Sequence, residues 1–418
     1  MPIFLSRRQF VAEVASSAIG LAVVPVILIA ICTGETRLLR AEPVQLRVAT
    51  FNVALHRPRA GELIHELESG NCLKAKKLAE IIQSIRPHVI LINELDYDQQ
   101  CKAARLFNQK YLAVSQNGHK PLVFPYFHAG PVNTGVPSTV DLNKDGVTEG
   151  PADAFGYGMF PGQYGMTLFA MFPIQQARIR TFQTFLWKDM PGALLPIDPK
   201  TGQPYYSSRD LAVLRLSSKG HWDIPLQIGR NVLHVLASHP TPPVFDGPED
   251  RNGSRNHDEI RFWADYVLPD RSQYIYDDQG VCGGLAAGSH FVVLGDLNAD
   301  PQDGASRNRA VCQLTEHPAF NHKLTPRSEG AAQQAVLQGG VNHKHRGDAA
   351  SDTCDFSEQG PGNLRVDYVL PSNNLSPRQA GVYWPRTNEP GFHLIDASDH
   401  RLVWVDIEVS CPHKSPSH

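Results

Sequence analysis

The chain has 418 residues, which is enough for one large domain or two medium-sized ones. Its hydrophobic content of 42% is ample for a core. The formal net charge is −3 and no long basic tract occurs, so the sequence carries no electrostatic footprint for tight binding of duplex nucleic acid. This argues only weakly against a nuclease, because a few arginines brought together by folding would suffice.

Residues 1–41 resemble an export signal of the twin-arginine type. Arg7 and Arg8 form a charged segment, and the apolar stretch 14–31 follows it. Pro25 and several small residues argue against a permanent membrane span, although the stretch is about long enough to cross a bilayer. An uncleaved membrane anchor is therefore the alternative. We expect a periplasmic or secreted protein.

Two apolar segments in the first hundred residues each end in a polar side chain. Segment 48–52 ends in Asn52, and segment 89–94 ends in Glu94. Short apolar runs of this kind predict buried strands. Ligand sites gather at the strand ends of sheets that helices cover, so both side chains are candidates for such a site.

Six cysteines lie beyond the N-terminal segment. An even number of cysteines in an oxidising compartment predicts disulfides. We expect one disulfide between Cys72 and Cys101, which flank the second predicted strand and the helix before it. We expect another between Cys312 and either Cys282 or Cys354, and the sequence leaves this choice open. Buried free thiols are the alternative, and the lack of a Cys-x-x-Cys pair makes a zinc cluster unexpected.

Residues 114–162 are rich in Gly, Pro and Asp and are interpreted as an insertion between core strands. Asp141, Asn143 and Asp145 occupy the first, third and fifth positions of a loop whose sixth residue is Gly146. This spacing is typical of the start of an EF-hand loop, and we predict a structural Ca²⁺ site there. The usual glutamate at the twelfth position is missing, so a solvent-exposed turn is the alternative.

A further apolar segment, 232–239, ends in His239 and runs directly into a proline-rich loop. We expect this loop, residues 240–257, to lie over the site. A helix is predicted after it, over 258–267, from the spacing of apolar residues. The loop contains four side chains that could contact a substrate: Arg251, Arg255, Asn256 and His257. A surface loop with Asn and Asp caps is the alternative.

The most informative segment, 291–298, ends in Asp296-Leu-Asn298. In an extended strand, residues i and i+2 point to the same side, so this carboxylate and this amide emerge together. Such a pair suits a metal-bound water or a phosphoryl oxygen better than it suits a core. An ordinary Asx-turn at the end of a strand is the alternative.

Two segments near the end of the chain also bring polar residues to predicted strands. Segment 364–371 carries Asp367 inside an apolar run, and Ser398, Asp399 and His400 stand just before the closing strand. A single polar residue at a strand end is unremarkable. Six strands that deliver acids, amides and histidines together predict one shared site.

The domain itself is expected to span residues 42–412 and to include the insertion. Residues 328–352, rich in Gln, Gly, His and Lys, are interpreted as a mobile surface loop. Residues 413–418 are interpreted as a disordered tail.

This ordered series of motifs resembles the endonuclease/exonuclease/phosphatase superfamily. That superfamily includes pancreatic-type deoxyribonucleases, abasic-site endonucleases, neutral sphingomyelinases and inositol-polyphosphate phosphatases. The Gly-Asp-Leu-Asn of 295–298 and the Ser-Asp-His of 398–400 carry the resemblance, together with segment 160–174, which is similar to the family's middle strand. The resemblance implies an α/β (α+β) fold: a four-layer sandwich of two mixed β-sheets packed face to face, with helices outside and the site at one edge.

The resemblance also implies a role for most strand-end residues. His400 would be the general base that activates water, and Asp367 would accept its other ring N–H. Glu94 would hold a divalent cation, Mg²⁺ or Mn²⁺, with Asn52 and Asp399 as further ligands.

The remaining residues would act on the phosphoryl group. Asp296 would orient the nucleophile, and Asn298 would donate hydrogen bonds to the phosphoryl oxygens. His239 would protonate the leaving group or stabilise the pentavalent state.

These implications predict an exported, Mg²⁺-dependent phosphoesterase that acts as a monomer. The substrate would be a nucleic acid, a phospholipid head group or a small organophosphate. A secreted nuclease, a phospholipid phosphodiesterase and a phosphomonoesterase all stay open. The non-enzyme alternative is a family member that has lost catalysis and binds a partner.

Overall fold

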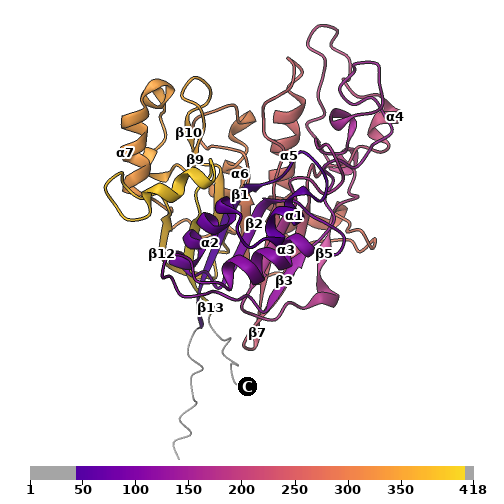
Figure 1. Ribbon diagram of the computed structural model, residues 1–418. Coiled ribbons are helices and arrows are strands. Elements are labelled where there is room, and N and C mark those ends of the chain that lie inside the picture. The colour runs from indigo at the N-terminus through magenta and orange to yellow at the C-terminus, as the bar shows by residue number, and fades with distance from the viewer. Residues whose placement is uncertain (1–43, 410–418) are drawn as a thin grey trace, which may run out of the picture. The chain divides into compact units, whose positions relative to one another are not determined.

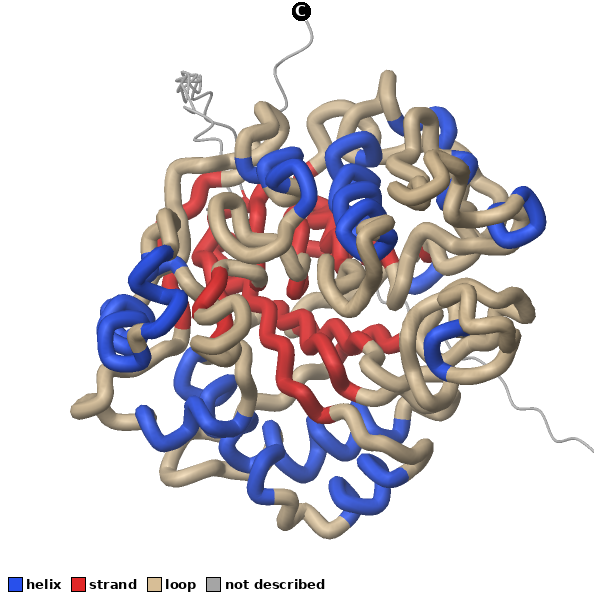
Figure 2. Tube along the Cα trace, turned by 90° about the horizontal axis from the view of Figure 1, so that it is seen from above, coloured by secondary structure: helices blue, strands red, loops and turns tan. Residues whose placement is uncertain are grey.

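Two mixed β-sheets pack face to face in the computed structural model of the protein, which describes residues 44–409 (Figure 1). Helices cover the outer faces of both sheets, so the strands lie between two groups of helices (Figure 2). The four-layer sandwich implied by the family resemblance is therefore confirmed. The expected export segment, 1–41, and the expected tail, 413–418, lie outside the described residues.

The first sheet has six strands in the order β12-β13-β1-β2-β4-β3. Strands β1 and β2 run parallel, and the other neighbouring pairs run antiparallel. The apolar segments predicted at 48–52 and 89–94 form β1 and β2, and the middle-strand segment forms β4. In spatial order the strands span Ser376–Val382, Val403–Val409, Val44–Leu55, Val89–Leu95, Met166–Ala170 and Tyr126–Ala129.

The second sheet has five strands in the order β11-β8-β7-β6-β5. Strands β7 and β8 run parallel, and the other neighbouring pairs run antiparallel. In spatial order these strands span Asp367–Pro371, His290–Asp296, Asn231–Ser238, His221–Ile228 and Arg180–Thr181. A short ribbon pairs β9, Cys354–Asp355, with β10, Asn363–Leu364.

The helices are short except for α2 and α5. The α-helices are α1 Glu62–Glu68, α2 Leu73–Ile85, α3 Lys102–Phe107, α4 Ser208–Leu211, α5 Arg251–Tyr266, α6 Cys312–Thr315 and α7 Glu329–Gln338. The other turns of helix are η1 Asn108–Leu112, η2 Pro151–Asp153, η3 Gln176–Arg178, η4 Trp187–Asp189, η5 Ser272–Tyr274, η6 Arg307–Arg309, η7 Gly340–Lys344, η8 Ala349–Ser351 and η9 Phe392–Ala397. No helix among residues 44–409 combines the length and hydropathy that a membrane span requires.

Both faces of the central strands are buried, which explains their continuous apolar runs. In β2, Leu91 packs between the two sheets, whereas Ile92 packs against α1, α2 and α3. In β8, Leu294 packs between the sheets, whereas Val293 packs against α5. Successive side chains of a strand point to opposite faces. Each of these two strands therefore packs with the other sheet on one face and with helices on the other face.

One edge of the sandwich collects the polar strand ends. The parallel pairs β1–β2 and β7–β8 each finish at this edge. Strand β11 runs antiparallel to β8, and Asp367, its first residue, pairs in register with Asp296, the last residue of β8. Strand β13 runs antiparallel to β1 and pairs Val403 with Thr50, so His400 lies just before it at the same edge. The topology therefore places the predicted site residues together.

Three predicted segments are wrong in detail. The insertion at 114–162 contains β3, an edge strand of the first sheet. Helix α5 begins at Arg251 rather than at 258. Its first half is polar and has no apolar periodicity, so the sequence pattern did not reveal it. The predicted surface loop at 328–352 contains α7, whose buried face is built of small or polar residues such as Ala331 and Ala335.

The predicted disulfides are also wrong within the described residues, where five cysteines are free thiols. Their sulfur atoms face different carbonyl or carboxylate oxygens. The Sγ of Cys72 lies 3.8 Å from Glu66 Oε2, and the Sγ of Cys101 lies 3.8 Å from the carbonyl oxygen of Ala129. The remaining free thiols are Cys282, Cys312 and Cys354. The alternative of buried free thiols therefore holds in full only for Cys354, because Cys282 is exposed and the other three are partly exposed.

Asp352 gives the fold a dependence on pH. This carboxyl group is only 6% exposed, and burial together with the charges of Asp300, Asp303 and Asp348 raises its pKa to about 8. The same group has a pKa of about 4 in an unfolded chain. Ionisation of Asp352 therefore opposes folding increasingly as the pH rises from about 4 to about 8.

We expect Asp352→Asn to stabilise the protein above neutral pH. The free energy of unfolding should rise by roughly 5 kcal/mol at pH 8.5 and should change little near pH 4. Urea unfolding curves at the two pH values measure this difference. The exposed Asp270→Asn is the control and should show no such dependence. An equal effect of Asp352→Asn at both pH values would contradict the assignment.

Candidate functional site

Asp296, the last residue of β8, lies at the centre of the polar edge. Its Oδ2 accepts a hydrogen bond of 3.0 Å from Asn52 Nδ2, which comes from the other sheet. The same oxygen lies 3.4 Å from His239 Nε2 and 3.7 Å from His400 Nε2. The structure therefore brings three other predicted residues, from both sheets, to one buried carboxylate oxygen of Asp296.

His400 is held by a second carboxylate. Its Nδ1 lies 2.8 Å from Asp367 Oδ2, and Thr353 Oγ1 donates a hydrogen bond of 2.9 Å to the same oxygen. With Nδ1–H directed to Asp367, the imidazole presents Nε2 toward Asp296. This contact is the one expected between a general base and the carboxylate that orients it.

The charges around His400 favour its protonated form. Burial alone would lower the pKa of His400, but the carboxylates of Asp367 and Asp296 outweigh burial and raise that pKa. Burial alone would also raise the pKa of Asp296, but the two neighbouring imidazoles, His400 first, hold that pKa below its usual range. The two carboxylates therefore stabilise the imidazolium that forms when His400 accepts a proton.

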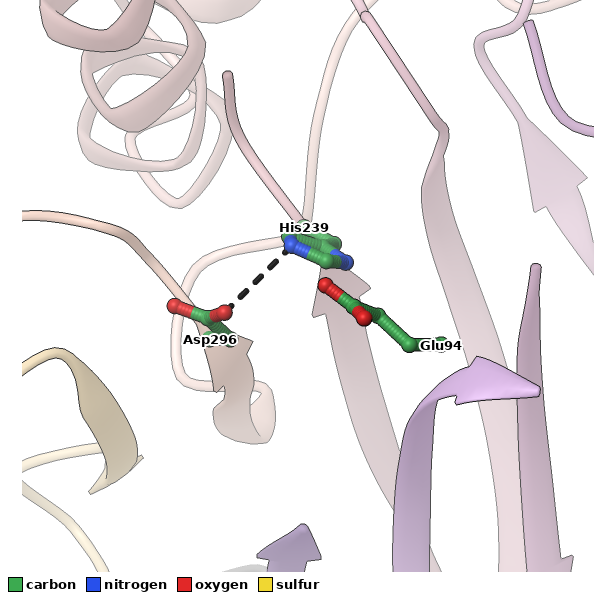
Figure 3. A group of neighbouring side chains, drawn as sticks. All are labelled: Glu94, His239 and Asp296. Atoms are coloured by element: carbon green, nitrogen blue, oxygen red, sulfur yellow. Dashed lines mark ion pairs between the residues drawn. The ribbon is translucent and has the colours of Figure 1, made fainter. Parts of the chain in front are cut away.

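Glu94 extends from β2 in a backbone conformation that is uncommon outside glycine, with φ of 61°. Its Oε2 lies 2.9 Å from His56 Nδ1. Burial alone would raise the pKa of Glu94, but the hydrogen bond from His56 and the charge of His239 bring it to about 2. Glu94 and Asp296 both direct their carboxylates toward the ring of His239 (Figure 3).

Two overlapping groups of side chains could hold a metal ion. One comprises Glu94, His239 and Asp296, and the other comprises Asp296, Asp367 and His400. In each group the ligand atoms lie within 4.8 Å of one another. His239 Nδ1 and Asp367 Oδ1 are buried and have no hydrogen-bond partner among the described residues. Both groups offer two carboxylates, which suit Mg²⁺ or Mn²⁺, and one imidazole. Because Asp367 and His400 contact each other in the second group, the first group is the better candidate for a divalent cation.

Three predicted residues contact no metal-binding group or have other partners within the protein. Asn52 uses both amide atoms within the protein, because its Oδ1 accepts a hydrogen bond of 3.1 Å from the Ala54 N–H. Asn298 donates from Nδ2 to the Pro240 carbonyl at 3.1 Å. Asp399 is exposed and belongs to neither metal-binding group. Their roles toward a metal or a phosphoryl group stay predictions.

Lys219 is a site residue that the sequence did not reveal. Its side chain is buried, and its Nζ donates to the Pro240 carbonyl at 3.3 Å. Burial lowers the pKa of Lys219, while the charges of Glu259, Glu94 and Asp296 oppose that shift. The residue lies in a short Ser-Ser-Lys-Gly turn before β6, where no periodicity distinguishes it from a solvated lysine.

A cavity of about 620 Å³ opens beside Glu94 and His239. Arg251 and Arg255 line it as the sequence predicted for the loop after β7. The two other residues predicted there do not line it. Asn256 donates to the carbonyls of Thr241 and Leu297, and the Nδ1 of His257 lies 3.0 Å from Asp258 Oδ1. Asn256 therefore ties α5 to the loops after β7 and β8.

The predicted calcium loop forms a tight turn with internal hydrogen bonds. Asp141 accepts from the N–H groups of Asp145 and Gly146 at 3.2 and 2.9 Å. Asn143 accepts from Asp145 N–H at 3.1 Å, and Asp145 accepts from Val147 N–H at 2.9 Å. These contacts are compatible with either alternative, so the Ca²⁺ site stays a prediction.

The fold and the site together define a class: a four-layer sandwich with carboxylates and imidazoles gathered where the strands of both sheets end. The family model of the endonuclease/exonuclease/phosphatase family matches residues 49–400. The chain therefore belongs to the endonuclease/exonuclease/phosphatase family. Members of this family are metal-dependent phosphodiesterases and nucleases.

Solved structures with a similar fold include three from different organisms. An endonuclease/exonuclease/phosphatase from Beutenbergia cavernae is 16% identical, with a TM-score of 0.47 over 88% of this chain and 72% of that chain. Sphingomyelinase C from Streptomyces griseocarneus is 14% identical, with a TM-score of 0.40 over 87% and 99%. Truncated TDP2 from Caenorhabditis elegans is 13% identical, with a TM-score of 0.40 over 87% and 98%. No curated protein matches the chain in sequence.

Proposed function

We propose that the protein is an exported phosphoesterase that depends on a divalent cation and uses His400 to activate water. The observation that carries this proposal is the convergence of Asn52, His239 and His400 on one oxygen of Asp296. A shared buried centre of this kind has no evident structural purpose, because it concentrates charges that are costly to bury.

His400 is the proposed general base. Asp367 fixes the ring by its contact with Nδ1, and Nε2 faces Asp296 across 3.7 Å. A water molecule between these two groups could give its proton to Nε2 while Asp296 holds it for in-line attack on phosphorus. The neighbouring carboxylates then stabilise the imidazolium that results.

Glu94, Asp296 and His239 would hold the metal ion. When bound, Mg²⁺ or Mn²⁺ supplies positive charge that stabilises the non-bridging phosphoryl oxygens. Burial, and then the charge of Lys219, lowers the pKa of His239, so its neutral form is favoured. A neutral imidazole serves as a ligand or a hydrogen-bond donor, which favours stabilisation of the pentavalent state over protonation of the leaving group.

The proposal of export rests on the twin arginines and the apolar stretch at the N-terminal end of the chain. In the periplasm or outside the cell, such an enzyme would act on a phosphodiester or a phosphomonoester.

We expect the purified protein to release nitrophenolate from bis(p-nitrophenyl) phosphate or from p-nitrophenyl phosphate when Mg²⁺ or Mn²⁺ is present. EDTA should abolish the release, and excess Mg²⁺ should restore it, because both substrates report phosphoester cleavage directly. Comparing the two rates distinguishes a diesterase from a monoesterase. No turnover of either substrate, or of plasmid DNA and sphingomyelin, would contradict the proposal and favour a binding protein.

A further inference from the structure

The cavity beside Glu94 and His239 is lined largely by loops and by the first turns of α5. We propose that it binds the alcohol moiety of the phosphate ester, and that this moiety is a compact, largely apolar ring system. The inference rests on the proposed function, since the phosphoryl group is placed at the metal-binding edge. A volume of about 620 Å³ is that of a small-molecule pocket.

The walls of the cavity are mainly apolar and aromatic. The insertion at 114–162 contributes Leu142, Ala154 and Tyr157, and the loop after β7 contributes Val244 and Phe245. One end of the same cavity is formed by Glu94 of β2 and by His239, which directly follows β7. An ester bound with its phosphorus at the metal-binding edge would therefore extend its alcohol between these two segments.

Phe245 is held at the mouth of the cavity at an energetic cost. Its side chain is 87% exposed, and its backbone φ is 66°, which is unfavourable for a bulky residue. Asn252 fixes the loop on both sides of it: Nδ2 donates to the Val244 carbonyl at 2.7 Å, and the Asn252 N–H donates to Asp246 Oδ2 at 2.6 Å. The loop thus presents an aromatic ring to solvent in a defined position, which suits stacking on a ligand ring.

The cavity contains a buried polar group without a partner. Thr241 is 7% exposed, and its hydroxyl oxygen is buried without a hydrogen-bond partner in the described part of the chain. Tyr206 is also 7% exposed. Both residues line the cavity. An apolar pocket with a small number of unpaired polar groups is typical of a site that orients one small ligand.

The cations of the cavity do not form a surface for a polyanion. Arg255 donates its guanidinium hydrogens to the carbonyls of Leu216, Phe155 and Arg215, and Arg251 forms an ion pair with Glu249. Lys219 lies at the metal-binding end, next to where the reacting phosphoryl group is placed. The rest of the cavity therefore favours an alcohol without further phosphates over a nucleic-acid strand.

Calorimetric titration with two phosphonates tests the inference without requiring turnover. With Mg²⁺ present, phenylphosphonate should bind the protein at least about 10-fold more tightly than methylphosphonate, because its ring is buried in the cavity. Ala154→Phe fills the cavity and should remove this preference while leaving the affinity for methylphosphonate unchanged. Phe245→Ala, an exposed position that folding does not require, should reduce the preference about 3-fold, because ring stacking is lost. Ile197→Ala, which is also exposed and lies outside the cavity, should not.

The outcomes separate this inference from the proposed function. Equal affinities for both phosphonates in a protein that hydrolyses nitrophenyl phosphates would overturn the inference alone. A preference for phenylphosphonate in a protein without any turnover would overturn the proposed function alone. Sedimentation with phosphatidylcholine vesicles that depends on Phe245 would show that the exposed ring docks on a bilayer, and would also overturn the inference.

Discussion

We expect His400→Ala to lower kcat by roughly 10³-fold, because general acid–base catalysis contributes effects of this size. His400 Nε2 is the ring nitrogen left free by Asp367, and it is directed to the carboxylate that would hold the attacking water. Alanine removes the base and leaves both carboxylates in place. Initial rates on the better nitrophenyl substrate at saturating Mg²⁺ measure the loss.

The control for this variant is His343→Ala, which removes an exposed imidazole on η7. Its kcat should equal that of the wild type. Thermal unfolding of both variants shows whether the fold persists. Full activity of a folded His400→Ala protein would refute the assignment of the base.

Glu94→Gln should lower kcat/KM at least about 100-fold at limiting Mg²⁺, since even the loss of an indirect metal contact costs 10- to 100-fold. Glutamine keeps the size of the side chain but removes its charge from the first metal-binding group. The midpoint of a Mg²⁺ titration of the activity should move to a higher concentration, because cation affinity depends on carboxylate ligands.

The exposed Glu316→Gln serves as the control, because that carboxylate only pairs with Arg309 on the surface. It should leave the Mg²⁺ titration unchanged. A Glu94→Gln protein with a wild-type Mg²⁺ midpoint would show that Glu94 does not hold the metal ion, whatever its effect on kcat.

The sequence predicted the parts of the site that lie at the ends of apolar strands. Asp296 and Asn298 could be found because a strand of buried residues has a clear pattern and a clear end. Asp367 lies near Asp296 because it begins the neighbouring strand of the same sheet, whereas His400 precedes a strand of the other sheet. These are local patterns, and the topology only had to bring them together.

Other features depend on contacts between distant segments, and no local pattern marks them. Lys219 is buried and donates a hydrogen bond to Pro240 in the loop after β7. Thr353, just before β9, donates a hydrogen bond to Asp367 in β11. Helix α7 buries mainly small residues, so its sequence has little apolar periodicity. Cys72 and Cys101 stay free because their sulfur atoms contact different partners. An even number of cysteines in the sequence carries no information about these directions.

The split of the site between two sheets has a consequence for how the protein can change. Asn52 and Glu94 come from the first sheet, whereas His239 and Asp296 come from the second. Each sheet supplies only part of the site. The apolar contacts between the two sheets therefore also set the distances between the reacting groups. Leu91 lies between the two sheets and takes no part in the chemistry. Leu91→Ala should nevertheless lower the turnover rate as well as the stability of the protein.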